Sequence, residues 1–302
     1  MASPGEWLPG PGMPVVSGLV SPPPHPRRST LPTLPVVSLA ASLLACRQEP
    51  AKVPAPPAAA AAVIPEGSYG DAVRRGRALL IATKDSLPTH VGNQLRCVSC
   101  HLDEGRRETG SWVGVFAHYP QYRARSGAIE TIEYRVNDCF RRSMNGVALD
   151  PASHDMADIV TYLAFLSRGT PIGPPQPNTR LQQWAAFKAD TAAGRQIFGT
   201  TCVACHGPDG EGSIGAPPLW GPQSYNVGAG MARVRTAAEF IRRNMPFDQP
   251  GTLTDQQAFD VAAYVNARPR PDYRGKENDW PNGDPPPDVA YPTRAAQQKK
   301  PR

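Results

Sequence analysis

The 302-residue sequence has little cysteine or histidine, with six of each. It also offers little apolar sequence for a membrane-spanning helix. The apolar run at residues 36–45 is too short, because such a helix needs about 20 predominantly apolar residues. The net charge of +6 is not accompanied by a nucleic-acid-binding motif. A mild positive excess therefore suits acidic partners or anionic substrates better than nucleic acid.

Residues 1–46 resemble a bacterial lipoprotein signal peptide. Arg27 and Arg28 precede the apolar run, and "LLAC" ends at Cys46, which would carry the lipid anchor. The alternative is an ordinary secretory signal cleaved near Ala45. Either one directs the chain to the periplasm. Residues 47–66 are rich in Ala and Pro, and this composition predicts a disordered linker.

Four of the six cysteines belong to two C-x-x-C-H motifs. The motif residues are Cys97, Cys100 and His101, followed later in the chain by Cys202, Cys205 and His206. In such a motif the two thiols bond haem covalently and the histidine becomes the proximal iron ligand. A C-x-x-C pair can also bind zinc or form a disulfide. Two widely separated motifs, each with its own histidine, favour two covalently bound c-type haems.

The sequence around these motifs indicates an internal duplication. "GRALLIAT" and "GRQIFGTT" precede the two motifs, and stretches with apolar residues at helical spacing, 155–171 and 255–271, follow them. The sequence therefore predicts an all-α fold. Its two cytochrome c-like haem domains lie in tandem at residues 67–172 and 181–271, joined by a Pro-rich linker at 173–180. An irregular Pro-rich tail follows at 272–302.

Each haem iron needs a sixth ligand or an open position. In the second domain Met245 is the candidate, in a loop ahead of the last helix, and His/Met ligation raises the reduction potential. A packed core methionine is the alternative. In the first domain Cys139 and Met144 compete. The spacing from the haem motif favours Cys139, and the spacing to the following helix favours Met144.

Three stretches, "LRCVSCHLDEGR", "GVFAHYPQYRARSG" and "RVNDCFRRSMNG", precede the second haem motif in that order. Together they resemble the dihaem thiosulfate dehydrogenases over about residues 65–270. The resemblance implies that Cys139 ligates the first haem, and it matches Arg125, Arg135 and Ser143 to the family motif. It also implies that two thiosulfates are joined into tetrathionate, with two electrons passing to an external acceptor such as a soluble cytochrome c. Some relatives have a lysine where this chain has Asn244, so a lysine-to-methionine ligand switch is not expected.

The residues around Cys139 suit that chemistry. Apolar residues at helical intervals predict an amphipathic helix at 129–143, on which Arg135, Cys139, Arg142 and Ser143 share one face. Cations near a thiol favour the nucleophilic thiolate, and guanidinium groups bind oxyanions. At about 4 Å and an effective dielectric constant of about 20, two unit charges repel by about 4 kcal/mol. A basic pocket would offset this repulsion between two thiosulfate dianions.

Other polar residues near the motif have a simpler interpretation. A basic face exposed to solvent explains Arg107, Arg123, Arg141 and Arg142 as well as a role in a site does. His118 and His154 are expected to be surface or packing residues.

We therefore predict a periplasmic thiosulfate dehydrogenase. Thiosulfate docks on Arg125 and Arg135 beside the first haem, Cys139 acts on its outer sulfur, and the second haem passes electrons out. Three alternatives stay open. They are a dihaem electron carrier without substrate chemistry, a tetrathionate reductase, and a sulfur-oxidation cytochrome subunit.

Overall fold

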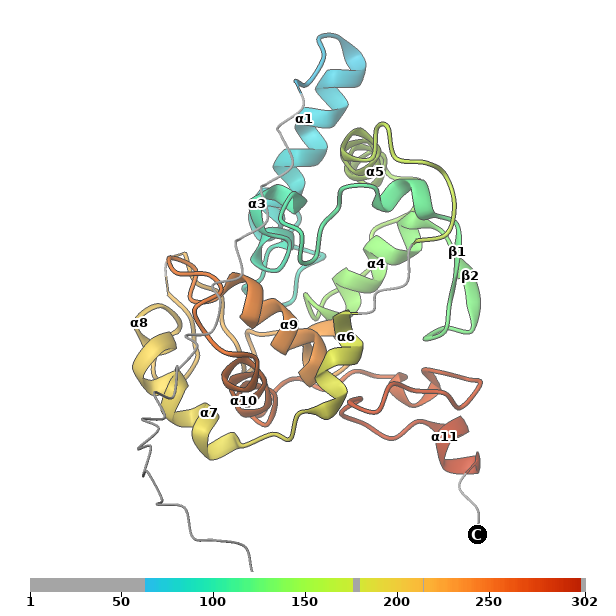
Figure 1. Ribbon diagram of the computed structural model, residues 1–302. Helices are drawn as coiled ribbons and strands as arrows, with labels where there is room; N and C mark the ends of the chain where they lie inside the picture. Colours follow the sequence, from blue (N-terminus) through green and yellow to red (C-terminus); the bar gives the residue numbers. More distant parts are fainter. Residues whose placement is uncertain (1–62, 176–179, 214, 300–302) are drawn as a thin grey trace, which may run out of the picture. The chain divides into compact units, whose positions relative to one another are not determined.

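The computed structural model describes residues 63–175, 180–213 and 215–299. All of them belong to one compact unit, Glu49–Arg302. Cys46, the predicted signal peptide and most of the predicted linker lie outside the described residues. The described chain is mostly helical, as the sequence predicts, and its two haem motifs fall in two successive halves (Figure 1).

The first half is built on two crossing helices, α1 and α5, which flank the first haem motif. Its elements are α1 (Ser68–Ile81), α2 (Thr83–Ser86), η1 (Cys97–Ser99), α3 (Leu102–Gly105), η2 (Val115–His118), β1 (Gln121–Arg123), β2 (Ala128–Glu130), α4 (Ile132–Arg142) and α5 (His154–Leu166).

The second half repeats this plan, with α7 and α9 packed against α10. Its elements are α6 (Arg180–Gln183), η3 (Trp184–Ala186), α7 (Thr191–Ile197), the π-helical turn η4 (Phe198–Cys202), α8 (Val203–His206), η5 (Gly230–Ala232), α9 (Val234–Asn244) and α10 (Asp255–Asn266). The tail adds η6 (Lys276–Asn278) and α11 (Arg294–Lys299).

A glycine permits the helix crossing in each half. A Cβ atom on Gly76 of α1 would lie 1.9 Å from the carbonyl oxygen of Asp158 in α5. A Cβ atom on Gly194 of α7 would lie 2.1 Å from the carbonyl oxygen of Asp260 in α10. These distances are far below van der Waals contact, so any other residue would push the helices apart. The duplication inferred from sequence is thus repeated in the packing.

Polar caps fix where the main helices begin. The side chains of Thr131 and Ser153 accept hydrogen bonds from backbone N–H groups in the first turns of α4 and α5. Asp190 does the same for α7, and Thr254 with Gln257 forms a capping box on α10. Each cap satisfies amide groups that have no partner within the helix.

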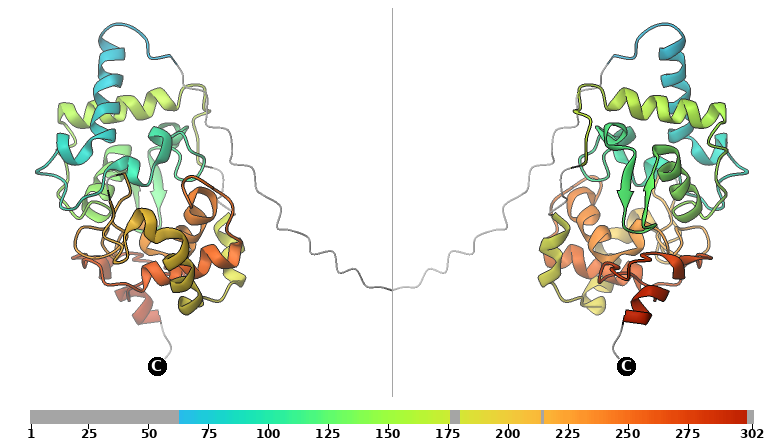
Figure 2. Two further views of the ribbon diagram at one scale, coloured as in Figure 1. Left: turned by 90° about the vertical axis from the view of Figure 1, so that its left-hand side faces the viewer. Right: turned by 90° about the vertical axis from the view of Figure 1, so that its right-hand side faces the viewer.

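The helix predicted for residues 129–143 begins later than expected. Residues Ala128–Glu130 form β2 instead, paired antiparallel with β1 in a two-stranded sheet (Figure 2). The Thr131 cap ends the strand and starts α4. Ile129, counted in the apolar helical pattern, is 68% exposed on the hairpin. A single apolar residue at the boundary of an element fits both the alternation of a strand and the periodicity of a helix.

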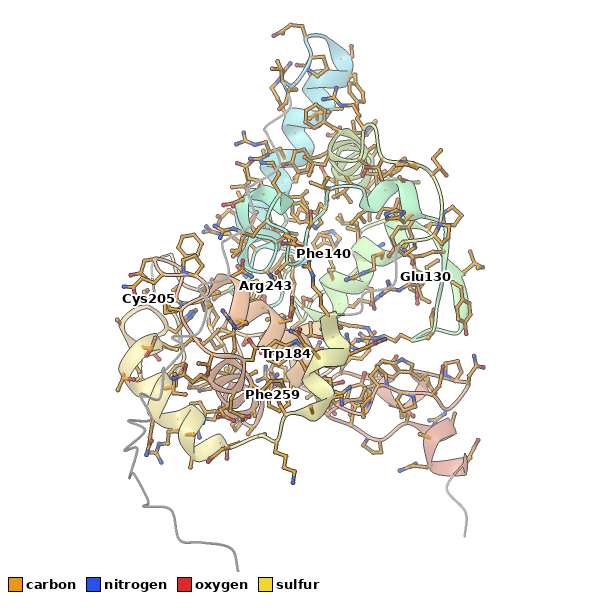
Figure 3. All side chains as sticks on the ribbon, in the orientation of Figure 1. Glu130, Phe140, Trp184, Cys205, Arg243 and Phe259 are labelled. Atoms are coloured by element: carbon orange, nitrogen blue, oxygen red, sulfur yellow. The ribbon has the colours of Figure 1, made fainter. Side chains whose placement is uncertain are left out.

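Each half has its own apolar core, around side chains labelled in Figure 3. Phe140 of α4 is buried in the first core with residues of α1 and α5. Trp184 and Phe259 stack in the second core with ring centroids 6.1 Å apart. A smaller cluster joins the halves, where Leu95 packs against Tyr225.

Asn93 forms a polar bridge between the halves. It is fully buried, and its Nδ2 donates to the carbonyl oxygens of Ser143 at 2.9 Å and Ser224 at 3.0 Å. The backbone N–H of Gln94 also donates to the carbonyl of Gln223. The end of α4 is therefore tied to the second half.

The C-terminal tail packs closely on the rest of the chain. Trp280 is 4% exposed and Thr293 is 1% exposed, although the segment has little regular secondary structure. Within the described ranges, no helix has the length and apolar character needed to cross a bilayer.

Candidate active site

The first half encloses a cavity beside the C-x-x-C-H motif. Aliphatic and aromatic side chains supply most of its wall, with a few sulfur and polar groups among them. The lining residues are Leu80, Leu95, Arg96, Cys97, Cys100, His101, Trp112, Val136, Cys139, Phe140, Ser143, Met144, Ile159 and Leu163. A porphyrin needs an apolar slot with two thiols and a histidine at one wall, so these residues fit a covalently attached haem.

His101 is oriented for axial ligation. Its Nδ1 lies 2.5 Å from the carbonyl oxygen of Gly110, and this contact assigns the proton to Nδ1 and leaves Nε2 free for iron. The imidazole also stacks on Trp112, with centroids 4.7 Å apart. Burial lowers the pKa of His101 to about 4, so the ring is neutral, as a metal ligand must be. Burial also raises the pKa of Cys97 and Cys100 to about 12.

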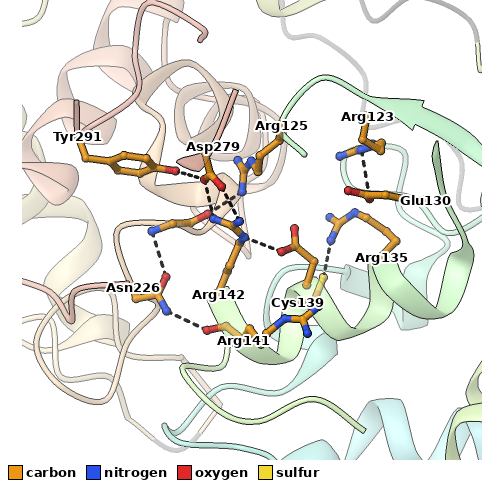
Figure 4. A network of polar contacts seen from close by, with 12 residues as sticks. Arg123, Arg125, Glu130, Arg135, Cys139, Arg141, Arg142, Asn226, Asp279 and Tyr291 are labelled. Carbon is orange, nitrogen blue, oxygen red and sulfur yellow. Dashed lines mark hydrogen bonds and ion pairs between the residues drawn. The ribbon is translucent and has the colours of Figure 1, made fainter. Parts of the chain in front are cut away.

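Cys139 lies on α4. It is distant from the haem motif in the sequence but lines the same cavity. The guanidinium of Arg135, one helical turn earlier, donates from Nη1 to Cys139 Sγ at 2.9 Å (Figure 4). The electrostatic interaction with Cys139 is the main cause that raises the pKa of Arg135. The pair therefore combines a fixed cation with a sulfur that can ligate iron or attack a substrate.

Met144, the competing ligand candidate, lines the same cavity. It is 2% exposed and belongs to the first apolar core. The two candidates differ in their polar surroundings, since it is Cys139 that receives a hydrogen bond from a guanidinium. Ser143 also lines the cavity, and its backbone carbonyl accepts from Asn93.

Arg142 is not part of a solvated basic face. It is 8% exposed and forms two hydrogen bonds with Asp279 of the tail, at 2.7 and 2.8 Å. It also donates to Asp138 at 2.5 Å, and Tyr291 donates at 2.6 Å to Oδ2 of Asp279, which also accepts from Arg142 (Figure 4). These contacts direct the guanidinium to carboxylates, so its charge is already compensated.

Arg125 lies near this network with a different kind of partner. Its Nη1 donates to the carbonyl oxygen of Gly228 at 2.7 Å, and its guanidinium carbon lies 5.0 Å from the ring centroid of Trp280. Burial, with the charge of Arg142 next, lowers the pKa of Arg125. Arg125 is outside the set of residues that line the cavity around His101.

Asp138 is the common neighbour of the three arginines. Burial acts to raise the pKa of Asp138, but the charges of Arg142, Arg135 and Arg125 outweigh it and the pKa is lowered. The sequence position next to Cys139 thus carries a carboxylate among three guanidinium groups. Adjacent anion and cation charges keep the site from being uniformly positive.

The remaining polar residues considered from sequence lie apart from this network or at its edge. Arg107 pairs with Asp103, Arg123 lies 3.9 Å from Glu130, Arg141 lies over Tyr134, His118 contacts the carbonyl of Gly173, and His154 begins α5.

The second half holds its motif residues in a comparable arrangement. His206 Nδ1 lies 2.9 Å from the carbonyl oxygen of Pro217, which again leaves Nε2 free, and burial lowers the pKa of His206. Cys202 packs beside the second half's aromatic cluster around Trp220. Met245 is half-buried at the C-terminal end of α9, and Asn244 is buried. These donors fit a second haem.

Sequence reasoning missed the tail. Asp279 and Trp280 contact arginines of the first half from more than a hundred residues away, and Tyr291 donates a hydrogen bond to Asp279. The one available signal was the set of three aromatic residues, Tyr273, Trp280 and Tyr291, in an otherwise proline-rich segment, because large aromatic side chains tend to be buried.

Two oriented motif histidines, each with its own pair of thiols, define a c-type cytochrome with two haem domains. Two family models match in the same order: "SoxA/TsdA, cytochrome c domain" at residues 89–172 and "Cytochrome C oxidase, cbb3-type, subunit III" at residues 189–265. The chain belongs to the thiosulfate dehydrogenase family. It is 44% identical to thiosulfate dehydrogenase of Psychrobacter arcticus over 234 residues, covering 75% of this chain and 72% of that one.

Two further comparisons agree. Thiosulfate dehydrogenase of Allochromatium vinosum is 41% identical over 251 residues, which cover 77% of this chain and 90% of that protein. The solved structure of thiosulfate dehydrogenase (TsdBA) from Marichromatium purpuratum superposes with a TM-score of 0.65 at 38% identity. That match covers 70% of this chain and 49% of the solved chain, so this chain spans about half of it.

Proposed function

We propose that this protein oxidatively couples two thiosulfate ions into tetrathionate and passes two electrons through two c-type haems to an external acceptor. One observation carries the proposal beyond family membership. Cys139 lines the first haem cavity, and the guanidinium of Arg135, outside the lining residues, lies 2.9 Å from its sulfur. An electron carrier has no need of a cation-paired thiol, whereas a sulfur-transfer enzyme needs an activated one.

We infer that Arg135 and Arg125 bind the sulfonate oxygens of thiosulfate, with Ser143 near the same wall. Guanidinium groups match the geometry of oxyanions and offset part of the repulsion between dianions. Of the three arginines around Asp138, Arg142 is the least suited to bind substrate, because two carboxylates already use its donors.

We assign Cys139 a reaction in two steps, an oxidation followed by a displacement. The thiolate Sγ and the outer sulfur of one thiosulfate form an S–S bond as two electrons leave, giving a cysteine sulfanesulfonate. The outer sulfur of a second thiosulfate then attacks the sulfur bonded to Sγ. This forms tetrathionate, breaks the bond to Sγ and returns the thiolate.

The haems, when bound, supply the one-electron acceptors for this oxidation. The residues assigned to hold them are Cys97, Cys100, His101 and Cys139 for the first, and Cys202, Cys205, His206 and Met245 for the second. Thiolate ligation lowers a haem potential and His/Met ligation raises it, so this ligand set favours electron flow from the first to the second. We propose a soluble cytochrome c or a similar protein as the acceptor.

We also propose a periplasmic location, with lipid anchoring through Cys46. The support is the signal-like composition of residues 27–46 and the covalent haem motifs. Globomycin sensitivity of processing and incorporation of labelled palmitate into the wild-type chain, absent from the Cys46→Ser variant, would support the anchor. Normal processing without label would contradict it.

The proposed reaction is tested by anaerobic incubation of purified holoprotein with thiosulfate and an oxidised acceptor. We expect one tetrathionate for every two electrons transferred. Acceptor reduction without tetrathionate would contradict the proposal, and the reverse assay with tetrathionate and a reduced donor measures the opposite direction.

A further inference from the structure

Trp280 has an unusual backbone conformation for a large residue. Its φ is +52°, in the left-handed region that bulky side chains rarely adopt. The residue is nevertheless 4% exposed and in contact with Tyr291, with centroids 6.3 Å apart. A strained conformation persists only where the surrounding contacts impose it, and such positions concentrate at functional sites.

The contacts that hold Trp280 converge on Arg125. The backbone N–H of Trp280 donates to the carbonyl oxygen of Arg125 at 2.7 Å, and the indole lies against the guanidinium at 5.0 Å. The carbonyl of Gly228 accepts from Nη1 on another side. These partners fix the orientation of the Arg125 side chain, yet neither carries a net negative charge.

Asp279, the residue before Trp280, contacts a different arginine and carries a negative charge. Asp279 takes two donors of Arg142 and compensates its charge. In the described structure, by contrast, the partners of the Arg125 guanidinium are a carbonyl and an aromatic ring. Two adjacent tail residues therefore hold two nearby arginines differently. The donors of Arg142 are used by carboxylates, whereas Arg125, in the described part of the chain, interacts with Asp138 and Asp279 only through space and donates a hydrogen bond to neither.

We propose that Trp280 is a positioning residue for substrate binding. It holds the guanidinium of Arg125 so that this group can bind a sulfonate oxygen of thiosulfate next to Cys139. The inference rests on the proposed role of Arg125 in thiosulfate binding. The C-terminal tail then belongs to the substrate site, although it contains none of the haem ligands.

The test compares steady-state kinetics of purified holoprotein for wild type, Trp280→Leu and Trp280→Phe. Trp280→Leu removes the aromatic face, and we expect the KM for thiosulfate to rise about 10-fold with kcat within about twofold, since a cation–π contact at a partly desolvated site has this magnitude. Trp280→Phe keeps an aromatic face and should restore most of the affinity. The spectrum of the oxidised haems should be the same in all three.

Tyr134→Leu is the matched control. Tyr134 also lies under a guanidinium, that of Arg141 at 5.4 Å, but on the face of α4 away from the cavity. Its loss should leave KM unchanged. An unchanged KM in Trp280→Leu, or an equal rise in Tyr134→Leu, would overturn the proposal.

A double-mutant cycle separates positioning from general destabilisation. If Trp280 acts through Arg125, then Trp280→Leu should have no further effect on KM in an Arg125→Ala background. Additive effects would contradict the proposal, and Trp280→Met replaces Trp280→Leu in the same cycle if the leucine variant fails to fold.

Thermal stabilisation by sulfate distinguishes this inference from the proposed reaction. Sulfate is a tetrahedral dianion that cannot be coupled, and we expect its stabilisation of the holoprotein against heat to weaken in Trp280→Leu. If the wild type makes no tetrathionate but sulfate still stabilises it more than it stabilises Trp280→Leu, the proposed function is contradicted and the anion site is supported. Sulfate stabilisation equal in wild type and Trp280→Leu would contradict the site itself.

Discussion

Cys139 and Met144 are five residues apart and line the same cavity, but their polar surroundings differ. Arg135 donates to the sulfur of Cys139, whereas Met144 is packed into the apolar core. A thioether there needs no cation, and a thiolate does. At the scale of single residues, the position of one guanidinium supports the role proposed for Cys139.

Replacing Cys139 with serine should therefore lower kcat by at least about 100-fold, because the nucleophile and the proposed ligand are lost together. Met144→Leu conserves volume and should change the rate by less than about threefold. Stopped-flow reduction of an acceptor by thiosulfate measures both, and the spectrum of the oxidised protein reports the ligand. A Cys139→Ser variant with near-native rate would contradict the mechanism, as would loss of activity in Met144→Leu alone.

Much of the site could be predicted from sequence, because its chemistry follows local spacing. The haem motifs are contiguous, and Arg135 and Cys139 are separated by one helical turn, so both pairings follow from helix geometry. The roles of Arg125 and Arg142 could not be separated this way. Their distinction depends on Trp280 and Asp279, whose positions follow from the path of the tail and from no local pattern.

At the scale of elements, close helix crossings position the haem motifs. Gly76 lets α1 approach α5, just as Gly194 lets α7 approach α10. The sequence repeats contain both glycines, but their role becomes visible only in the distance to the facing carbonyl oxygen. Sequence predicted the terminal helices because their apolar periodicity is strong. It placed the start of α4 too early because β2 ends immediately before it.

Gly76→Ala should lower the free energy of unfolding by about 1–3 kcal/mol, because the new methyl group overlaps the carbonyl oxygen of Asp158. Gly199→Ala is the control, since a Cβ there has no heavy atom within 4 Å. Urea denaturation of the holoproteins measures the difference. Equal stability of the two variants would show that the α1–α5 crossing tolerates a wider separation.

Glu104 connects the turn after the first haem motif to the helices on either side. Its carboxylate accepts from Arg77 of α1 at 2.8 Å and from Arg106, and its carbonyl accepts from Tyr162 of α5. The hydrogen bond from Arg77 is the main cause that lowers the pKa of Glu104. The ion pair therefore stabilises the fold above the unfolded-state pKa, about 4.3, and this contribution disappears as the pH falls through the lower folded-state pKa.

Glu104→Gln should accordingly lower the free energy of unfolding at pH 7 by about 1 kcal/mol, a modest value because Arg77 is 43% exposed. The gap to wild type should be smaller at pH 3 than at pH 7, because the unfolded carboxylate is already protonated there and the advantage of the ionised folded form has decreased. Urea titrations at both pH values measure it, with the exposed Asp71→Asn as control. A gap that persists unchanged at pH 3 would show that packing, and not charge, makes the difference.

At the scale of the whole molecule, the tail contacts the first half through Asp279, which pairs with Arg142, 137 positions earlier in the chain. Arg142 and Asp279 are 10% and 7% exposed as side chains, so their pairing takes place largely out of water. Removing one partner from a buried pair is costly, because the remaining charge loses its compensation.

Asp279→Ala should therefore lower the free energy of unfolding by about 3 kcal/mol, with Asp138 limiting the loss as the remaining partner of Arg142. Asp272→Ala removes a tail carboxylate that is 72% exposed and should change it by less than about 0.5 kcal/mol. Chemical denaturation followed by circular dichroism compares the two. Similar small losses in both would mean that the tail adds little to the folded state.

The pairing of Arg142 with Asp279 has a consequence for a shortened chain. The residues that line the first cavity all lie between Leu80 and Leu163, and none of them belongs to the tail. A chain cut before Asp279 would therefore keep every residue assigned to hold the two haems but lose the buried partner of Arg142. Proteolysis at this end is expected to alter the charges beside α4 while the haem motifs stay intact.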